Sequence, residues 1–172
     1  KKLLGYTLND TQRFRTGVAQ ALDIAPQRVS CWVVGEHGAG QVPVFGSVTV
    51  DGEQVELDAK QREVVLDYAD NWYVRHVALD SGRTSTWSSG IGGALMIEAI
   101  VHSSPQPFPA SIVQTGEYGP SAMSLSVPVY LSSQGVTGVE VLQLSPQEQS
   151  ALEETAIKIA ELAETITVEG TH

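Results

Sequence analysis

Glycine and proline interrupt this chain so often that they constrain its fold more than any other feature. Three glycines fall within residues 35–40, and Pro105, Pro107 and Pro109 exclude a regular helix around them. Short runs rich in β-branched residues predict strands over residues 29–34, 41–50, 110–115, 125–131 and 136–144. Apolar residues at helical spacing predict helices from residue 9 or 10 to about 23, and over residues 58–80, 91–102 and 146–166.

The last of these helices has the clearest start. Ser145 can accept from the amide of Glu148, Pro146 needs no donor at the first helical position, and Glu148 can reach back to Ser145. A chain of 172 residues suits one domain. The elements together predict a single α+β domain over residues 1–172, with a mainly antiparallel sheet packed against long helices.

Charge and cysteine content exclude several classes of function. Lys and Arg number 10 against 20 Asp and Glu, and the resulting net charge of −10 disfavours nucleic acids and anionic membranes as partners. The sequence shows no transmembrane run and no signal peptide, which favours a cytoplasmic protein. Cys31 is the single cysteine, which excludes an internal disulfide and a thiolate metal cluster, and we predict no metal ligands elsewhere. The first residue is Lys1 rather than methionine, which indicates a fragment or a processed chain.

His37 is the first candidate for chemistry, because it follows a predicted strand and lies among glycines that let a ligand approach the backbone. An imidazole titrates near neutral pH and can give or take a proton during a reaction. Taken by itself, His37 is more typical of an ordinary surface loop, and that interpretation is then the favoured one.

Asp10 and Arg13 form the second candidate, since residues three apart share a helix face. The alternative is a helix cap at Asp10 and an ordinary surface cation at Arg13. In combination with His37, the pair indicates a site for proton transfer and anion binding. A carboxylate can hold an imidazole in one tautomer while a guanidinium binds an anionic substrate. These are the groups needed to oxidise an alcohol beside a carboxylate.

The chain resembles the C-terminal, substrate-binding half of the lactate/malate dehydrogenase family. The similarity follows family order through the motifs DTQRFR at 10–15, GEHG at 35–38, VPV at 42–44, GEYG at 116–119, LSVP at 125–128 and LSPQE at 144–148. It implies the α+β fold of that half, with His37 as proton donor and acceptor, Asp10 as its partner and Arg13 as the ligand of the substrate carboxylate. It also implies that Ser85 lines the substrate site, although a helix-entry loop is the alternative.

Some positions depart from the family. Ala39 and Gly40 replace an acidic residue and a serine-like residue after GEHG, and Gly46 replaces a commoner serine. Arg15 matches a basic residue that some bacterial relatives use to bind a regulatory anion. The partner histidine is Ser30 in this chain, so a structural role for Arg15 is favoured.

The resemblance implies an NAD-dependent dehydrogenase of malate or lactate, with a small 2-hydroxy or 2-keto acid as substrate. NAD would be bound mainly by a nucleotide-binding domain upstream of this chain. Gly90, Gly92 and Gly93 do not fit a dinucleotide fingerprint and favour close helix packing instead. The isolated domain is therefore expected to be inactive, and the parent enzyme to be a homodimer or homotetramer.

The alternative is a non-catalytic dimerisation or scaffold domain derived from the same family. Ala39 and Gly40 favour it, and the apolar stripes over residues 58–80 and 91–101 could supply its surface. Core packing against the sheet is the expected role for most of the apolar residues in those stripes.

Overall fold

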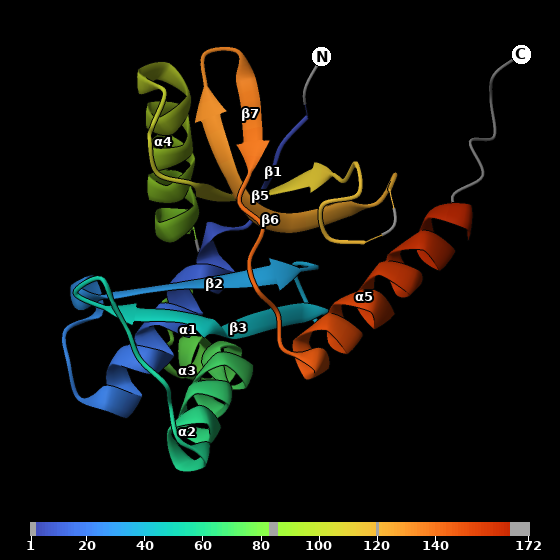
Figure 1. The fold of residues 1–172 in the computed structure, drawn as a ribbon. Coiled ribbons are helices and arrows are strands. Elements are labelled where there is room, and N and C mark those ends of the chain that lie inside the picture. The colour runs from blue at the N-terminus through green and yellow to red at the C-terminus, as the bar shows by residue number, and fades with distance from the viewer. Residues whose placement is uncertain (1–2, 83–85, 120, 166–172) are drawn as a thin grey trace, which may run out of the picture.

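The computed structural model describes residues 3–82, 86–119 and 121–165 (Figure 1). In chain order its elements are β1 (Gly5–Tyr6), α1 (Leu8–Leu22), a 3-10 turn (Pro26–Arg28), β2 (Val29–Gly35), β3 (Gln41–Val50), β4 (Glu53–Gln54), α2 (Ala59–Asp70), α3 (Trp72–Ala78), α4 (Thr86–His102), β5 (Phe108–Val113), β6 (Ser124–Ser132), β7 (Gly135–Val139) and α5 (Pro146–Thr165). The predicted α+β class is confirmed.

Every strand pairing in the sheet is antiparallel, as predicted. The strand order is β1-β5-β6-β2-β3-β4, and β7 pairs with β6 off this path. β2 and β3 pair from Val29 opposite Val50 to Gly35 opposite Gln41. β6 meets β2 at one residue pair, Gly35 opposite Ser126, so a single rung joins the two parts of the sheet.

Two hydrophobic cores lie on opposite faces of β2. Val33 packs with Phe14 and Val18 of α1 and with Val65 of α2, whereas Val34 packs with β6 residues and with Leu152 of α5. Adjacent strand residues point to opposite faces, so β2 contributes to both cores. In Figure 1, α2 and α3 lie below β2 and β3, α1 passes behind these two strands, and α4 with β5 to β7 lies above them.

The single helix predicted over residues 58–80 is wrong, because the chain breaks at Asn71 into α2 and α3. The Asn71 backbone leaves helical geometry, with φ −95° and ψ 12°, and its side-chain amide donates to Asp67 Oδ1 at 2.8 Å. The Asn71 backbone amide still donates to the Asp67 carbonyl at 3.0 Å, so α2 ends on an ordinary helical hydrogen bond and the chain changes direction after it. The apolar stripe is divided as a result. Val65 is fully buried, whereas Val77 and other α3 side chains are exposed.

α4 begins at Thr86, five residues before the predicted start of 91. Core packing is confirmed for Ala99, with Met96 and Ile100 partly buried against the same core. The expectation that most apolar residues of this stripe are core is wrong, because Ile91, Leu95, Ile97 and Val101 are exposed. Close packing of the glycines is confirmed at Gly92, where an added Cβ would overlap the Tyr6 ring, and is wrong at Gly90 and Gly93, where an added Cβ would meet nothing within 4 Å.

The strand predicted over residues 136–144 ends at Val139, and an irregular segment leads from there to α5. Tyr118 explains this difference, because its buried hydroxyl donates to the Glu140 carbonyl at 2.6 Å and accepts from the Leu142 amide at 2.9 Å. The predicted start of α5 is confirmed. Ser145 and Glu148 cap it reciprocally, with N–O distances of 2.8 and 3.3 Å.

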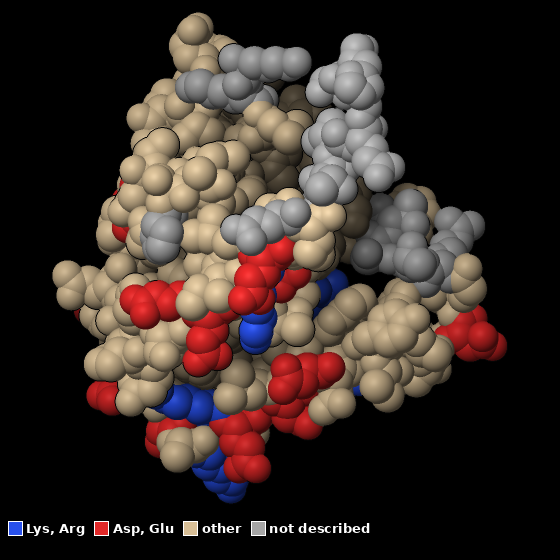
Figure 2. Space-filling model, turned by 90° about the vertical axis from the view of Figure 1, so that its right-hand side faces the viewer, with Lys and Arg blue, Asp and Glu red and all other residues tan. Residues whose placement is uncertain are grey.

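Acidic side chains gather over the lower half of the face in Figure 2, whereas its upper half shows almost no charge. Within the ranges that the structure describes, no helix is long and apolar enough to cross a membrane.

Candidate active site

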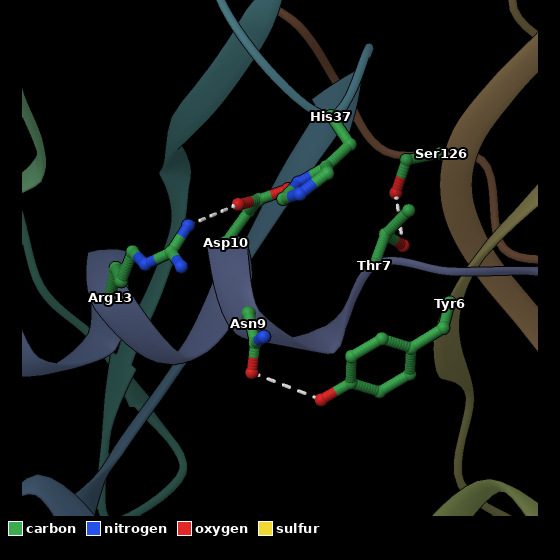
Figure 3. Close-up of polar contacts among 7 residues, drawn as sticks. All are labelled: Tyr6, Thr7, Asn9, Asp10, Arg13, His37 and Ser126. Atoms are coloured by element: carbon green, nitrogen blue, oxygen red, sulfur yellow. Dashed lines mark hydrogen bonds and ion pairs between the residues drawn. The ribbon is translucent and has the colours of Figure 1, made fainter. Parts of the chain in front are cut away.

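Asp10 lies in the first turn of α1, with its side chain only 5% exposed. Thr7 occupies the position before the helix, so Asp10 is not the cap that the alternative interpretation required. Its two carboxylate oxygens have different partners. Oδ1 accepts from Arg13 Nη1 at 2.9 Å, and Oδ2 lies 2.6 Å from His37 Nδ1 (Figure 3). The structure therefore brings the three predicted residues together around one buried carboxylate.

His37 reaches Asp10 from the loop between β2 and β3. Gly35 makes this loop possible, because its φ is +99° and a Cβ there would overlap the Gly40 carbonyl oxygen. The Glu36 amide donates to the same carbonyl at 3.1 Å and closes the turn. The sharp turn directs the imidazole back over the start of α1.

The Asp10 contact also assigns the roles of the two ring nitrogens. An ionised carboxylate only accepts, so Nδ1 is the donor to Asp10 Oδ2. Nε2 is then the nitrogen with a lone pair in the neutral ring. The imidazole is 58% exposed, and this leaves Nε2 open to a molecule outside the domain.

Arg13 is held by two groups. Besides the ion pair with Asp10, its Cζ lies 3.7 Å from the centroid of the Trp72 ring, and its side chain is 16% exposed. Burial lowers the pKa of Arg13, and the Asp10 carboxylate partly opposes this change. A cavity of about 460 Å³ lies beside Arg13 and is lined in part by Tyr68, Trp72 and Trp87.

Further polar contacts hold the start of α1 in place, and sequence reasoning missed all of them. The Tyr6 hydroxyl lies 3.0 Å from Asn9 Oδ1, and burial raises the pKa of Tyr6. The Thr7 and Ser126 hydroxyl oxygens lie 2.7 Å apart in a buried contact. Thr7 and Ser126 are 119 residues apart in the sequence, so no local spacing could have revealed the pair.

The remaining predicted residues have different outcomes. Ser85 lies outside the described residues. Arg15 donates through Nε to the Pro26 carbonyl at 2.8 Å and ties α1 to the turn that follows it.

Gly40 fits tightly against α5, because Thr155 Oγ1 donates to its carbonyl at 3.1 Å and an added Cβ would lie 2.7 Å from Thr155 Cγ2. The departure at position 40 therefore matches a close contact with α5.

Comparisons with known proteins agree with this architecture. A family model described as lactate/malate dehydrogenase, alpha/beta C-terminal domain, matches residues 7–169. A malate dehydrogenase from Halobacterium salinarum is 36% identical over 151 residues, which cover 88% of this chain and 49% of that protein. An L-lactate dehydrogenase from Lactococcus lactis is 29% identical over 168 residues, covering 94% of this chain and 53% of that protein.

Solved structures give the same result. The malate dehydrogenase from Salinibacter ruber matches with a TM-score of 0.82 and 28% identity, covering 94% of this chain and 53% of that chain. The malate dehydrogenase from Aeropyrum pernix matches with a TM-score of 0.83 and 27% identity, covering 96% of this chain and 56% of that chain. This chain spans about half the length of the relatives it matches.

The fold and the sequence match place this domain in a class, the α/β C-terminal domains of malate and lactate dehydrogenases. The chain belongs to the lactate/malate dehydrogenase family.

Proposed function

We propose that this chain is the substrate-binding half of an NAD-dependent dehydrogenase that acts on a small 2-hydroxy acid of the malate or lactate kind. One observation carries the proposal. The buried Asp10 carboxylate holds an imidazole on one oxygen and a guanidinium on the other. A proton-transfer group and an anion-binding group thereby lie side by side, and oxidation of a hydroxyl beside a carboxylate needs both.

In the proposed reaction, Arg13 binds the substrate carboxylate and His37 faces the hydroxyl at C2. His37 Nε2 takes the hydroxyl proton as C2 is oxidised to a ketone. The resulting imidazolium is stabilised by the Asp10 carboxylate at Nδ1. In the reverse direction the imidazolium donates its Nε2 proton to the keto oxygen as C2 is reduced. Asp10 keeps the ring in the productive tautomer in both directions.

NAD, when bound, would supply hydride acceptance or donation at C2. The residues present fit this arrangement, since the exposed side of His37 is open to a substrate and a cofactor ring. The described residues contain no unit of a strand, a glycine-rich turn and a helix of the dinucleotide-binding kind. Gly92 lies within α4 and packs against Tyr6. We therefore assign most NAD contacts to a separate nucleotide-binding domain. We place the parent enzyme in the cytoplasm as a homodimer or homotetramer.

The test uses the parent protein, in which the nucleotide-binding domain accompanies this chain. NADH oxidation is measured with oxaloacetate and with pyruvate. We expect His37→Asn to lower kcat by at least about a hundredfold, because the transferred proton loses its acceptor. His102→Asn at the end of α4 is the matched control and should retain activity. Full activity of the His37 variant, or turnover by the 172-residue chain alone, would contradict the proposal.

A non-catalytic association domain is the second candidate, and one observation favours it. Tyr73, Val74 and Val77 of α3 and Ile91, Ile97 and Val101 of α4 are large apolar side chains that lie exposed. Large apolar side chains left exposed are typical of faces that associate with other proteins. Sedimentation of wild type and an Ile97→Lys/Val101→Lys variant tests association. An inactive parent enzyme together with a wild-type chain that self-associates would favour this second function.

A further inference from the structure

Trp72 covers one face of the Arg13 guanidinium. The distance from Cζ to the ring centroid, 3.7 Å, is that of a stacked cation–π pair. Asp10 binds the same guanidinium through Nη1 at 2.9 Å. The indole and the carboxylate therefore contact the planar group at two places and together restrict its position and tilt.

This arrangement leaves one direction of approach to Arg13. Within the described ranges, its Nε and Nη2 make no hydrogen bond, and Arg13 lines the cavity of about 460 Å³. A carboxylate cannot bind through the face that the indole covers. It must approach edge-on, in the guanidinium plane, where two parallel hydrogen bonds can form.

The position of Trp72 follows from the helix break at Asn71. Trp72 is the first residue of α3, directly after the residue at which α2 ends. Its ring also contacts Tyr73 edge-on, with centroids 5.6 Å apart, and lies 6.0 Å from the His76 ring. These neighbours hold the indole, so the interruption that separates α2 from α3 places a fixed aromatic plane against α1.

We infer that Trp72 is a positioning residue, which holds Arg13 edge-on to the incoming carboxylate of the substrate. The inference rests on the proposed function, because it assumes that Arg13 is the carboxylate ligand. Removal of the indole should leave the ion pair with Asp10 in place and free the guanidinium to tilt. Carboxylate affinity then falls while the fold persists.

The experiment uses the 172-residue chain and oxamate, a non-reacting analogue of a 2-keto acid. NMR of the Arg13 side chain reports both the indole ring current at Nε–H and oxamate binding. Wild type is compared with Trp72→Leu, Trp72→Phe and Arg13→Gln. Trp32→Leu is the matched control, since Trp32 lines a different cavity, next to Arg15.

We expect Trp72→Leu to abolish the ring-current shift and weaken oxamate binding by about threefold to thirtyfold, the range that corresponds to a cation–π pair. Trp72→Phe should restore most of the affinity, and Trp32→Leu should not change it. Thermal unfolding of each variant separates loss of fold from loss of positioning.

The outcomes distinguish the two proposals. If Arg13→Gln abolishes binding and Trp72→Leu leaves the Kd within twofold, the inference about Trp72 is wrong and the proposed function stands. If Arg13→Gln binds oxamate as wild type does, the carboxylate role of Arg13 fails and both proposals fall. If the wild-type chain does not bind oxamate, the inference is overturned, and the proposed function is decided by the His37 assay of the parent protein.

Discussion

Gly40 shows how one missing side chain sets the position of the loop that carries His37. Its carbonyl accepts from both the Glu36 amide and the Thr155 hydroxyl, so the loop is tied to itself and to α5. The neighbouring Thr155 side chain is buried and β-branched, which leaves it few ways to move aside.

We therefore expect Gly40→Ala to lower the free energy of unfolding by about 1–3 kcal/mol, because the new Cβ overlaps Thr155 Cγ2. Urea unfolding of this variant, of Thr155→Ala and of the double variant measures the coupling. The double variant should lose less stability than the sum of the two single changes. Strict additivity would show that Thr155 is not the source of the clash.

For single residues, the sequence predicted which side chains form the candidate site better than it predicted the packing contacts around them. The shared helix face of Asp10 and Arg13 follows from their spacing, and the 2.9 Å ion pair agrees with it. The stacking of Trp72 on Arg13 could not be predicted, because it depends on where the helix breaks. The fit between Gly40 and Thr155 crosses 115 residues and leaves no local pattern.

Among the elements, the irregular segment between β7 and α5 depends most on a single side chain. Tyr118 binds this segment at Glu140 and Leu142, and burial raises the pKa of Tyr118 to about 12. Glu148 secures the other end, because its carboxylate caps α5 and also accepts from the Phe45 amide of β3 at 2.9 Å. The capping pattern was readable from sequence, whereas the contact with β3 was not.

The raised pKa of Tyr118 predicts a pH dependence of stability. The folded chain favours the neutral phenol, so the contribution is complete below about pH 10, the ordinary pKa of tyrosine. It is lost as pH rises through about 12, the pKa in the folded chain. Urea unfolding between pH 8 and 12 should show this loss.

Tyr118→Phe is the control for that measurement. The variant should lose about 1–3 kcal/mol at neutral pH, because two half-buried backbone groups lose their partner. It should also show a shallower decline above pH 10 than wild type. An equal decline in both proteins would assign the alkaline effect to other tyrosines.

In the molecule as a whole, the two parts of the sheet meet beside the candidate site. Gly35 of β2 and Ser126 of β6 form the rung that joins them, and Gly35 opens the loop to His37. The Ser126 hydroxyl forms a hydrogen bond with the hydroxyl of Thr7, the residue directly before α1. β6, β2 and the helix that carries Asp10 are therefore connected within a few residues.

The buried Thr7–Ser126 pair predicts a non-additive result. Ser126→Ala should cost about 1–3 kcal/mol, because the Thr7 hydroxyl is left buried and unpaired. Thr7→Val combined with Ser126→Ala should recover much of this loss, since neither hydroxyl then remains. Thermal unfolding of wild type and of these two variants measures both losses, and an equal loss in the single and double variants would argue against the pairing.

The overall architecture was predictable because alternating and helical apolar patterns determine which elements form. The boundaries of the helices and strands were less predictable. No apolar or capping pattern in the sequence marks the break at Asn71, and the early end of β7 accompanies a long-range hydrogen bond from Tyr118.

β2 carries one further consequence. Since Val33 and Val34 belong to different cores, the strand that leads to His37 is aligned by the packing on both of its sides. A methyl group removed deep in either interior would tilt this strand slightly and shift the imidazole relative to α1. Turnover in the parent enzyme should therefore decline after such remote truncations well before the domain loses its folded state.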